Sequence, residues 1–83
     1  MIAQPPVEPT RPTVSEARFA IEDRMGGFAA VTDQVLHIGP CKPAGRVSRA
    51  CRVRLVGDGT RRYRVVVTDM GRSWSVSAAL IRA

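Results

Sequence analysis

Apolar and arginine side chains alternate with a period of two in the second half of the chain, and this alternation constrains the fold most. From Cys51 to Leu55 the odd positions are apolar and the even positions are arginines. Tyr63, Val65 and Val67 continue the apolar odd positions in a second segment. Successive side chains of a β-strand point to opposite faces of a sheet. The pattern therefore predicts two strands, each with one buried face and one basic face in water.

The turn between these segments is constrained by the same parity. It contains Gly57-Asp58-Gly59-Thr60-Arg61, a glycine-rich sequence typical of turns. A two-residue turn would place Leu55 opposite Arg62 and set the two apolar faces against each other. A three-residue loop of residues 58–60, or a five-residue loop, places Leu55 opposite Tyr63 instead. We therefore predict an odd loop with a glycine-assisted bulge.

A third strand is predicted after the turn at Asp69-Met70-Gly71-Arg72. An even loop here places Trp74 opposite Val67 and completes a meander. The run from Ser77 to Ile81 is too short for a packed helix, and we expect one helical turn followed by a strand fragment. The apolar residues of the shared face form the predicted core: Val47, Cys51, Val53, Leu55, Tyr63, Val65, Val67, Trp74, Val76 and Leu80.

The first 27 residues differ from this β region. Residues 1–12 hold four of the six prolines, and three of these recur at every third position, the period of a polyproline II helix. Such a segment can dock in an aromatic groove, but we expect a disordered tail that folding does not need. Thr13-Val14-Ser15-Glu16 matches a helix capping box, which predicts a helix ending at Gly26-Gly27. The alternative for this segment is a strand with Ala17, Phe19 and Ile21 on one side.

Length and charge limit the architecture. The chain has 83 residues and a formal net charge of +6, so it forms one small basic domain. Residues 45–83 carry nine arginines against two aspartates, whereas residues 1–44 have a net charge of −1. A core of this size supplies only about 3–5 kcal/mol, so we expect a homo-oligomer or a subunit of a larger complex. No apolar run reaches the length of a membrane span and no signal peptide is evident, which predicts a soluble, cytoplasmic protein without membrane contact.

The order of segments from residue 28 to residue 83 resembles a small Src-homology-3-like barrel. The resemblance rests on Asp33-x-Val35, Gly45-Arg46-Val47, Arg62-Tyr63-Arg64-Val65 and the segment from Trp74 to Ile81. It implies a mainly β fold, either a barrel or a meander, behind the N-terminal helix. Proteins with this fold include KOW-type transcription and ribosomal modules, protein-binding adaptors and the plasmid-borne type II dihydrofolate reductases.

The reductases are similar in length and share the ending Ala78-Ala79-Leu80. Their active-site Val-Gln-Ile-Tyr segment corresponds to Arg72-Ser73-Trp74-Ser75 in this chain. The resemblance therefore implies a fold and not that activity.

Residues that support catalysis or bind metals are sparse. His37, Cys41 and Cys51, with Asp33, are conceivable metal ligands, but no pair has a familiar ligand spacing. A disulfide between the two cysteines is not expected in the cytoplasm. No second titratable partner of His37 is evident, so we expect no catalytic residue, no metal and no cofactor.

The arginines of the two predicted strands are the strongest functional signal. Arg52, Arg54, Arg62 and Arg64 are expected on the outside of one hairpin, with Arg54 opposite Arg64. Like charges that face each other across a sheet oppose folding, and a bound anion would neutralise them. We expect DNA or RNA phosphate to be that anion, with Arg46 and Arg61 as further contacts. The alternatives are a solvated face, and an adaptor or accessory subunit of phage or plasmid type that docks on an acidic protein surface.

Overall fold

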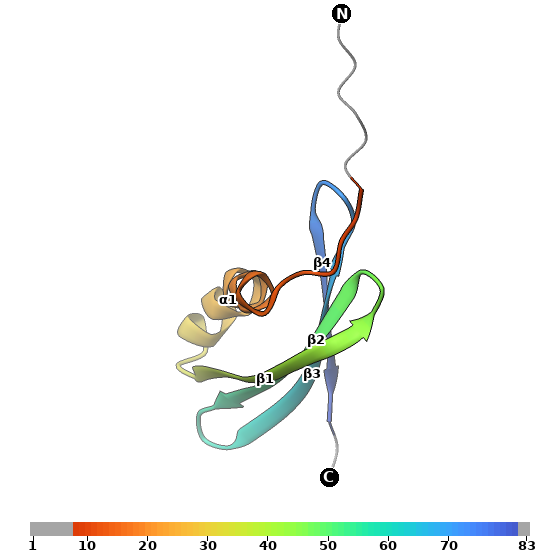
Figure 1. The fold of residues 1–83 in the computed structure, drawn as a ribbon. Helices are drawn as coiled ribbons and strands as arrows, with labels where there is room; N and C mark the ends of the chain where they lie inside the picture. The colour runs from red at the N-terminus through yellow and green to blue at the C-terminus, as the bar shows by residue number, and fades with distance from the viewer. Residues whose placement is uncertain (1–7, 82–83) are drawn as a thin grey trace, which may run out of the picture.

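A computed structural model of the chain describes residues 8–81, in which one helix precedes four strands (Figure 1). The strands form one antiparallel sheet in the order β1-β2-β3-β4. The predicted mainly β class is confirmed, and of the two predicted forms the structure has the meander. Its elements are α1 (Val14–Val31), β1 (Val35–Gly45), β2 (Ser48–Val56), β3 (Thr60–Asp69) and β4 (Trp74–Leu80).

The helix α1 begins at the predicted capping box. The backbone N–H of Glu16 donates to Thr13 Oγ1 at 3.1 Å, and the N–H of Thr13 donates to Glu16 Oε1 at 2.9 Å. The prediction that α1 ends at Gly26-Gly27 is wrong, because the helix continues to Val31. Each glycine costs a helix about 1 kcal/mol. Contacts of the last turn act against this cost, since Ala29 is buried and Thr32 Oγ1 donates to Phe28 O at 2.7 Å.

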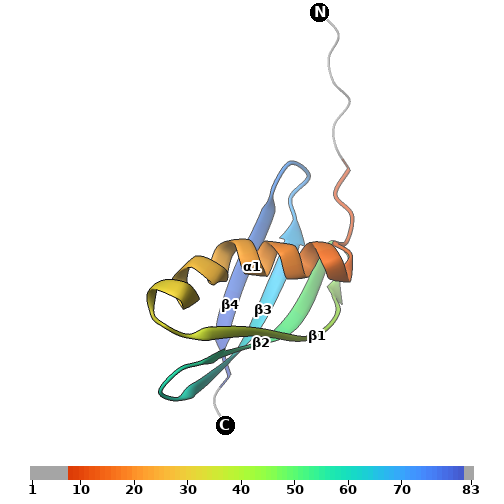
Figure 2. The same ribbon diagram turned by 90° about the vertical axis from the view of Figure 1, so that its left-hand side faces the viewer.

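The core lies between α1 and one face of the sheet (Figure 2). Ala17 and Ile21 of α1 are fully buried against the apolar side chains at odd positions of β2 and β3. The prediction is confirmed for Cys51, Val53, Leu55, Val65 and Val67, which are buried. Four members of the predicted core are only half-buried, namely Val47, Tyr63, Trp74 and Val76. Leu80 is 52% exposed, because it lies near the end of an edge strand.

The register of both hairpins differs from the prediction by two residues. The first loop has three residues, as predicted, but these are Gly57-Asp58-Gly59, so that Val53 lies opposite Tyr63. The second loop is even, as predicted, and Val67 lies opposite Val76. A shift of two positions keeps every side chain on its face, so the apolar pattern does not discriminate against it.

The end of the chain also differs from the prediction. β4 continues to Leu80 as a regular strand, without the predicted helical turn. Among the described residues, no helix has the length and apolar character needed to cross a membrane.

The segment before α1 lies against the sheet. Arg11 Nε donates to the carbonyl oxygen of Gly45 at 2.8 Å, and Arg49 Nε donates to that of Pro12 at 2.7 Å. Pro12 itself is buried. The predicted disordered tail of residues 1–12 is therefore wrong for residues 10–12, because these backbone groups find partners in the sheet. Residues 1–7 of that prediction lie outside the described residues.

The carboxylate of Asp69 anchors the same segment. It accepts hydrogen bonds from the backbone N–H groups of Thr10 at 2.9 Å and Gly71 at 2.8 Å. These bonds favour the charged carboxylate, so they lower the pKa of Asp69 below its ordinary value of 3.8. The side chain of one β3 residue thus connects the N-terminal segment with the β3–β4 turn.

Substitution of Ile21 tests the packing of the helix on the sheet. Because the side chain is fully buried, Ile21→Ala should lower the free energy of unfolding by about 2–5 kcal/mol, as measured by urea denaturation. Val31→Ala is the matched control, since Val31 lies on the same helix and is 87% exposed. Equal stability of the two variants would contradict the described core.

Acid titration tests the role of Asp69. Folding lowers the pKa of this carboxyl group. Its charged form therefore stabilises the folded protein at pH values above the pKa of the unfolded state, and this contribution is lost as the pH falls through the pKa of the folded state. We therefore expect Asp69→Asn to be less stable than wild type near pH 6, and the difference to shrink as the pH falls below the ordinary pKa of 3.8. Urea denaturation across this range measures it, with Asp58→Asn as the control for charge. A difference that does not change with pH would show that the anchor is absent.

Candidate nucleic-acid interface

The four predicted arginines lie together on the face of the sheet that α1 does not cover. We call this surface the arginine face and define it by Arg52, Arg54, Arg62 and Arg64, which are all exposed. The predicted side of the sheet is therefore correct. The pairing is not as predicted, because Arg54 lies opposite Arg62 and Arg52 lies opposite Arg64. The face therefore contains two like-charge pairs where the sequence predicted one.

Both arginine pairs occupy the close positions of the β2–β3 ladder. The N–H of Asp69 donates to Val47 O at 2.9 Å in the same register. Val47 and Asp69 are thus a hydrogen-bonded pair, and such pairs recur at every second position along the ladder. Both arginine pairs lie at the positions between them, which are not hydrogen-bonded. At such positions the Cα atoms are only about 4.5 Å apart and the side chains are closest. The like charges of each pair repel one another, and solvent, counter-ions or a bound anion reduce this repulsion.

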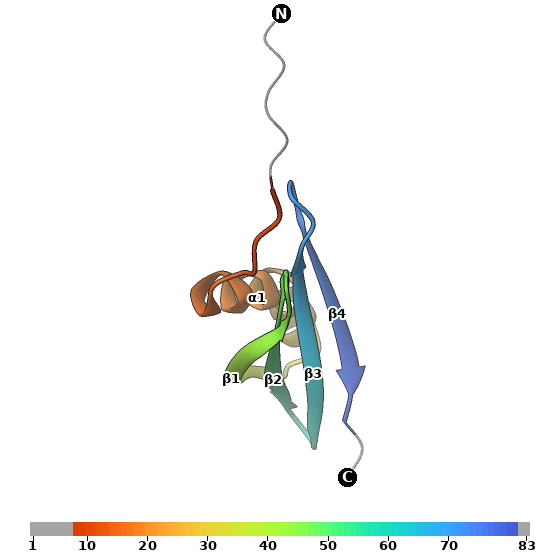
Figure 3. The ribbon, with the colours of Figure 1, turned by 45° about the vertical axis from the view of Figure 1, so that its right-hand side comes forward.

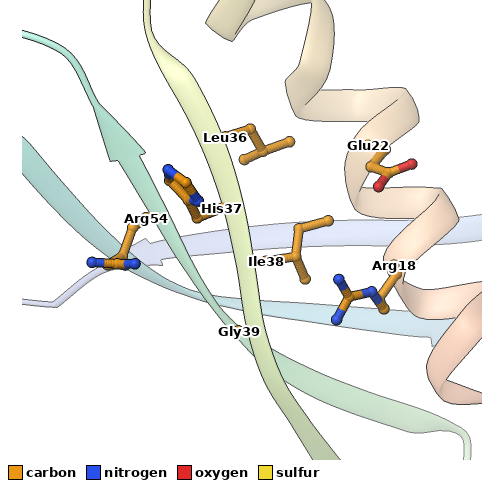
Figure 4. Close-up of a pocket in the computed structure, with 7 residues that line it drawn as sticks. All are labelled: Arg18, Glu22, Leu36, His37, Ile38, Gly39 and Arg54. Atoms are coloured by element: carbon orange, nitrogen blue, oxygen red, sulfur yellow. The ribbon is translucent and has the colours of Figure 1, made fainter.

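Two further residues extend the arginine face along β1, and sequence analysis did not assign them to it. His37 lies opposite Arg54, and Lys42 lies opposite Ala50. Figure 4 shows His37 on the opposite side of β1 from Leu36 and Ile38, which point toward α1. Register shifts between Ile38 and Cys41 interrupt the alternation of β1. Because of this interruption, the odd and even positions of the sequence do not predict on which face of the sheet Lys42 lies.

Arg46 and Arg61 lie away from the arginine face. Arg46 follows β1 in the turn that leads to β2. Arg61 lies opposite Leu55, whose side chain is on the helix side of the sheet. It borders a separate hollow together with Phe28 and Asp58. The structure brings four of the six predicted contact residues together.

The charge of the molecule is divided between its two layers. The arginine face with Lys42 carries five cations, and the strands place no aspartate or glutamate on this side of the sheet. The helix α1 carries two arginines against three acidic residues, a net charge of −1. Arg11 and Arg49 are used in hydrogen bonds to backbone carbonyls. Neither belongs to the arginine face, whose guanidiniums have no such hydrogen bond to a partner within residues 8–81.

The arginine face surrounds a shallow hollow with an apolar floor. Its volume is about 410 Å³, and its lining includes Lys42, Ala50, Arg52, Arg64, Pro40 and Ile81. Arg54 and Arg62 border a second hollow of about 310 Å³ beside it. Guanidinium groups donate paired hydrogen bonds to phosphate or carboxylate oxygens. The arrangement is suited to binding extended anions by charge and shape.

A disulfide joins Cys41 of β1 to Cys51 of β2. The two residues are directly opposite in the sheet, with their Cα atoms 4.0 Å apart. The expectation that these cysteines form no disulfide is wrong, because the β1 bulge brings them into register. A cysteine in a disulfide has no thiolate to offer a metal, so the set of His37, Cys41 and Cys51 is not a metal site in this form. Among residues 8–81, no three side chains of the metal-binding types form a group.

Comparisons with protein-family models, with curated proteins and with solved structures found no match to this chain.

Removal of one arginine pair tests the predicted repulsion. Arg54→Gln/Arg62→Gln keeps most of each stem and removes two facing charges, so the free protein should be as stable as wild type or more stable by a few tenths of a kcal/mol. The gain should fade between about 0.01 M and 1 M salt, where the Debye length falls from ~30 to ~3 Å. The matched control is Arg18→Gln/Arg24→Gln on α1, which has the same net charge. A loss of stability confined to the first variant would contradict the register.

Proposed function

We propose that the protein is a non-enzymatic module that binds nucleic acid through the arginine face. The supporting observation is the two facing arginine pairs on a sheet surface that α1 does not cover and on which the strands place no acidic side chain. Their repulsion opposes folding, and phosphates that lie between them turn this cost into binding energy. Arginines that only keep a surface in water do not need to face each other in pairs across two strands.

The proposed mode of binding depends on backbone and shape. Half or more of the hydrogen bonds between proteins and DNA go to phosphate and sugar. Base stacking on single strands needs exposed aromatic rings, but Trp74 and Tyr63 are half-buried toward the helix side. We therefore expect similar affinity for different sequences. Residues 28–83 resemble Src-homology-3-like barrels in sequence, and KOW-type modules have that fold, which agrees with this function as an analogy of fold.

The second candidate is an adaptor or accessory subunit that docks on an acidic protein surface. The disulfide favours this candidate, because cytosolic thiols are generally kept reduced. The predicted cytoplasmic location remains a prediction, and the disulfide weighs against it. A location in an oxidising compartment would separate the protein from most cellular DNA and RNA.

Titration of labelled nucleic acid at several salt concentrations tests the proposal. Four neutralised phosphates give a slope of log K against log salt of about −3 to −4 for duplex DNA. Arg54→Gln/Arg62→Gln should weaken binding to all sequences alike and flatten the slope by about two.

The control variant Arg18→Gln/Arg24→Gln has the same net charge and should bind as wild type does. Equal loss of binding in both variants would show a general effect of charge. Absence of wild-type binding at low salt would overturn the proposal and favour the acidic protein surface.

A further inference from the structure

The two edges of the sheet differ in their capacity to accept another strand. On the β1 edge, two register shifts bend the strand and Pro43 has no N–H to donate. Prolines, bulges and lysines are common protection against pairing at sheet edges. The β4 edge has none of them. The sequence from Trp74 to Leu80 has no charged residue, no proline and no glycine, and it pairs with β3 in seven consecutive positions.

The backbone of β4 presents a row of hydrogen-bonding groups to solvent. The N–H of Ile81, the residue after β4, donates to Arg62 O of β3 at 2.8 Å. In this register, the backbone N–H and C=O groups at the odd positions of β4 point toward β3. In an antiparallel ladder the alternate positions point away from the neighbouring strand. The N–H and C=O groups of Trp74, Val76, Ala78 and Leu80 therefore point outward, along the free edge that Figure 3 shows.

Exposed apolar side chains lie beside this free edge, on the helix side. Leu80 is 52% exposed, and Phe19 of α1 is 64% exposed. Phe19 lines a hollow between α1 and β4 together with Trp74 and Val76. The rim of this hollow carries one acidic and one basic residue, Asp23 and Arg24. Apolar groups at an unprotected edge favour association with another chain.

We propose that β4 is a self-association edge, at which a second copy of this chain adds its own β4 in antiparallel orientation. Only the backbone groups at even positions point outward, so even positions of the two copies pair with each other and the two-fold axis lies at a residue and not between two residues. When the two β4 strands overlap over their full length, this residue is Ser77. This register puts Trp74 opposite Leu80 of the second copy and Val76 opposite Ala78. It forms one eight-stranded sheet with both helices on the same side.

The uncharged edge is compatible with a second copy as the occupant. Each chain has a net charge of +6, so self-association needs a contact without facing cations. The strand from Trp74 to Leu80 provides one, and the hollow beside it adds one acidic and one basic residue, Asp23 and Arg24, and thus no net charge. The protected β1 edge ends the assembly at two copies, so no filament grows.

The size of the contact predicts a weak dimer. Seven residues of strand are about 23 Å long, and the strand and helix layers are together about 20 Å deep. Two such patches bury on the order of 900 Å² in total, at the small end of specific interfaces. The two arginine faces then lie on one continuous side of the dimer. This inference does not depend on what the arginine face binds.

Sedimentation equilibrium of the full chain, from about 10 μM to 1 mM, tests the proposal, since weak interfaces require this range. The wild-type mass should rise from 9.0 kDa toward twice that value. Amide hydrogen exchange at Val76 and Ala78 should slow over the same range.

Ala78→Lys should remain a monomer over this range, because it places two like charges beside the axis. Val35→Lys is the matched control, since Val35 is 57% exposed on the β1 edge, and it should dimerise as wild type does. Ala78→Pro removes one outward N–H without a new charge and should also remain a monomer.

A wild-type protein that stays at 9.0 kDa throughout would overturn the proposal and leave the edge to a strand of another protein. A dimer that persists in both Ala78 variants would overturn it as well. Circular dichroism verifies that each variant is folded.

Discussion

The packing of a single helix on one face of the sheet is the constraint on which the rest of the structure depends. Ala17 and Ile21 of α1 are fully buried against Val53 and Val65, and this contact fixes which side of each strand is inside. Within residues 8–81, no second layer covers the other side. The even positions of β2 and β3 are consequently left in water, and these positions hold the arginines. The location of the basic surface is therefore a consequence of the core.

A core this small needs additional connections, and the structure contains them between β1 and β2 and between the sheet and the segment before α1. The Cys41–Cys51 disulfide ties β1 to β2. The segment before α1 is held by hydrogen bonds at Gly45, Arg49 and Asp69. Small domains commonly depend on such connections, because their apolar burial alone offsets little more than the entropy of the chain. The disulfide also holds the bulged part of β1, in which Lys42 follows Cys41 and lies on the side of the arginine face.

The features that follow from local alternation were predictable from the sequence, and those that depend on tertiary contacts were not. Parity correctly assigned Val53, Val65 and the four arginines to their faces, but it is blind to a shift of two residues, so Arg54 was paired with the wrong partner. Gly26-Gly27 indicated a helix end because the burial of Ala29 is not visible in local sequence. The same holds for the bond from Arg49 to Pro12, which joins positions far apart in the chain.

Amide chemical-shift mapping with a short DNA duplex tests the central claim, that the uncovered face of the sheet is the binding surface. We expect the amide resonances of Arg52, Arg64 and Lys42 to shift as duplex is added at low salt, while those of Glu22 and Asp23 on α1 do not change. Shifts concentrated on α1, or spread evenly over both layers, would contradict it. Because the helix and the arginine face lie on opposite sides of one sheet, the two outcomes are clearly separable.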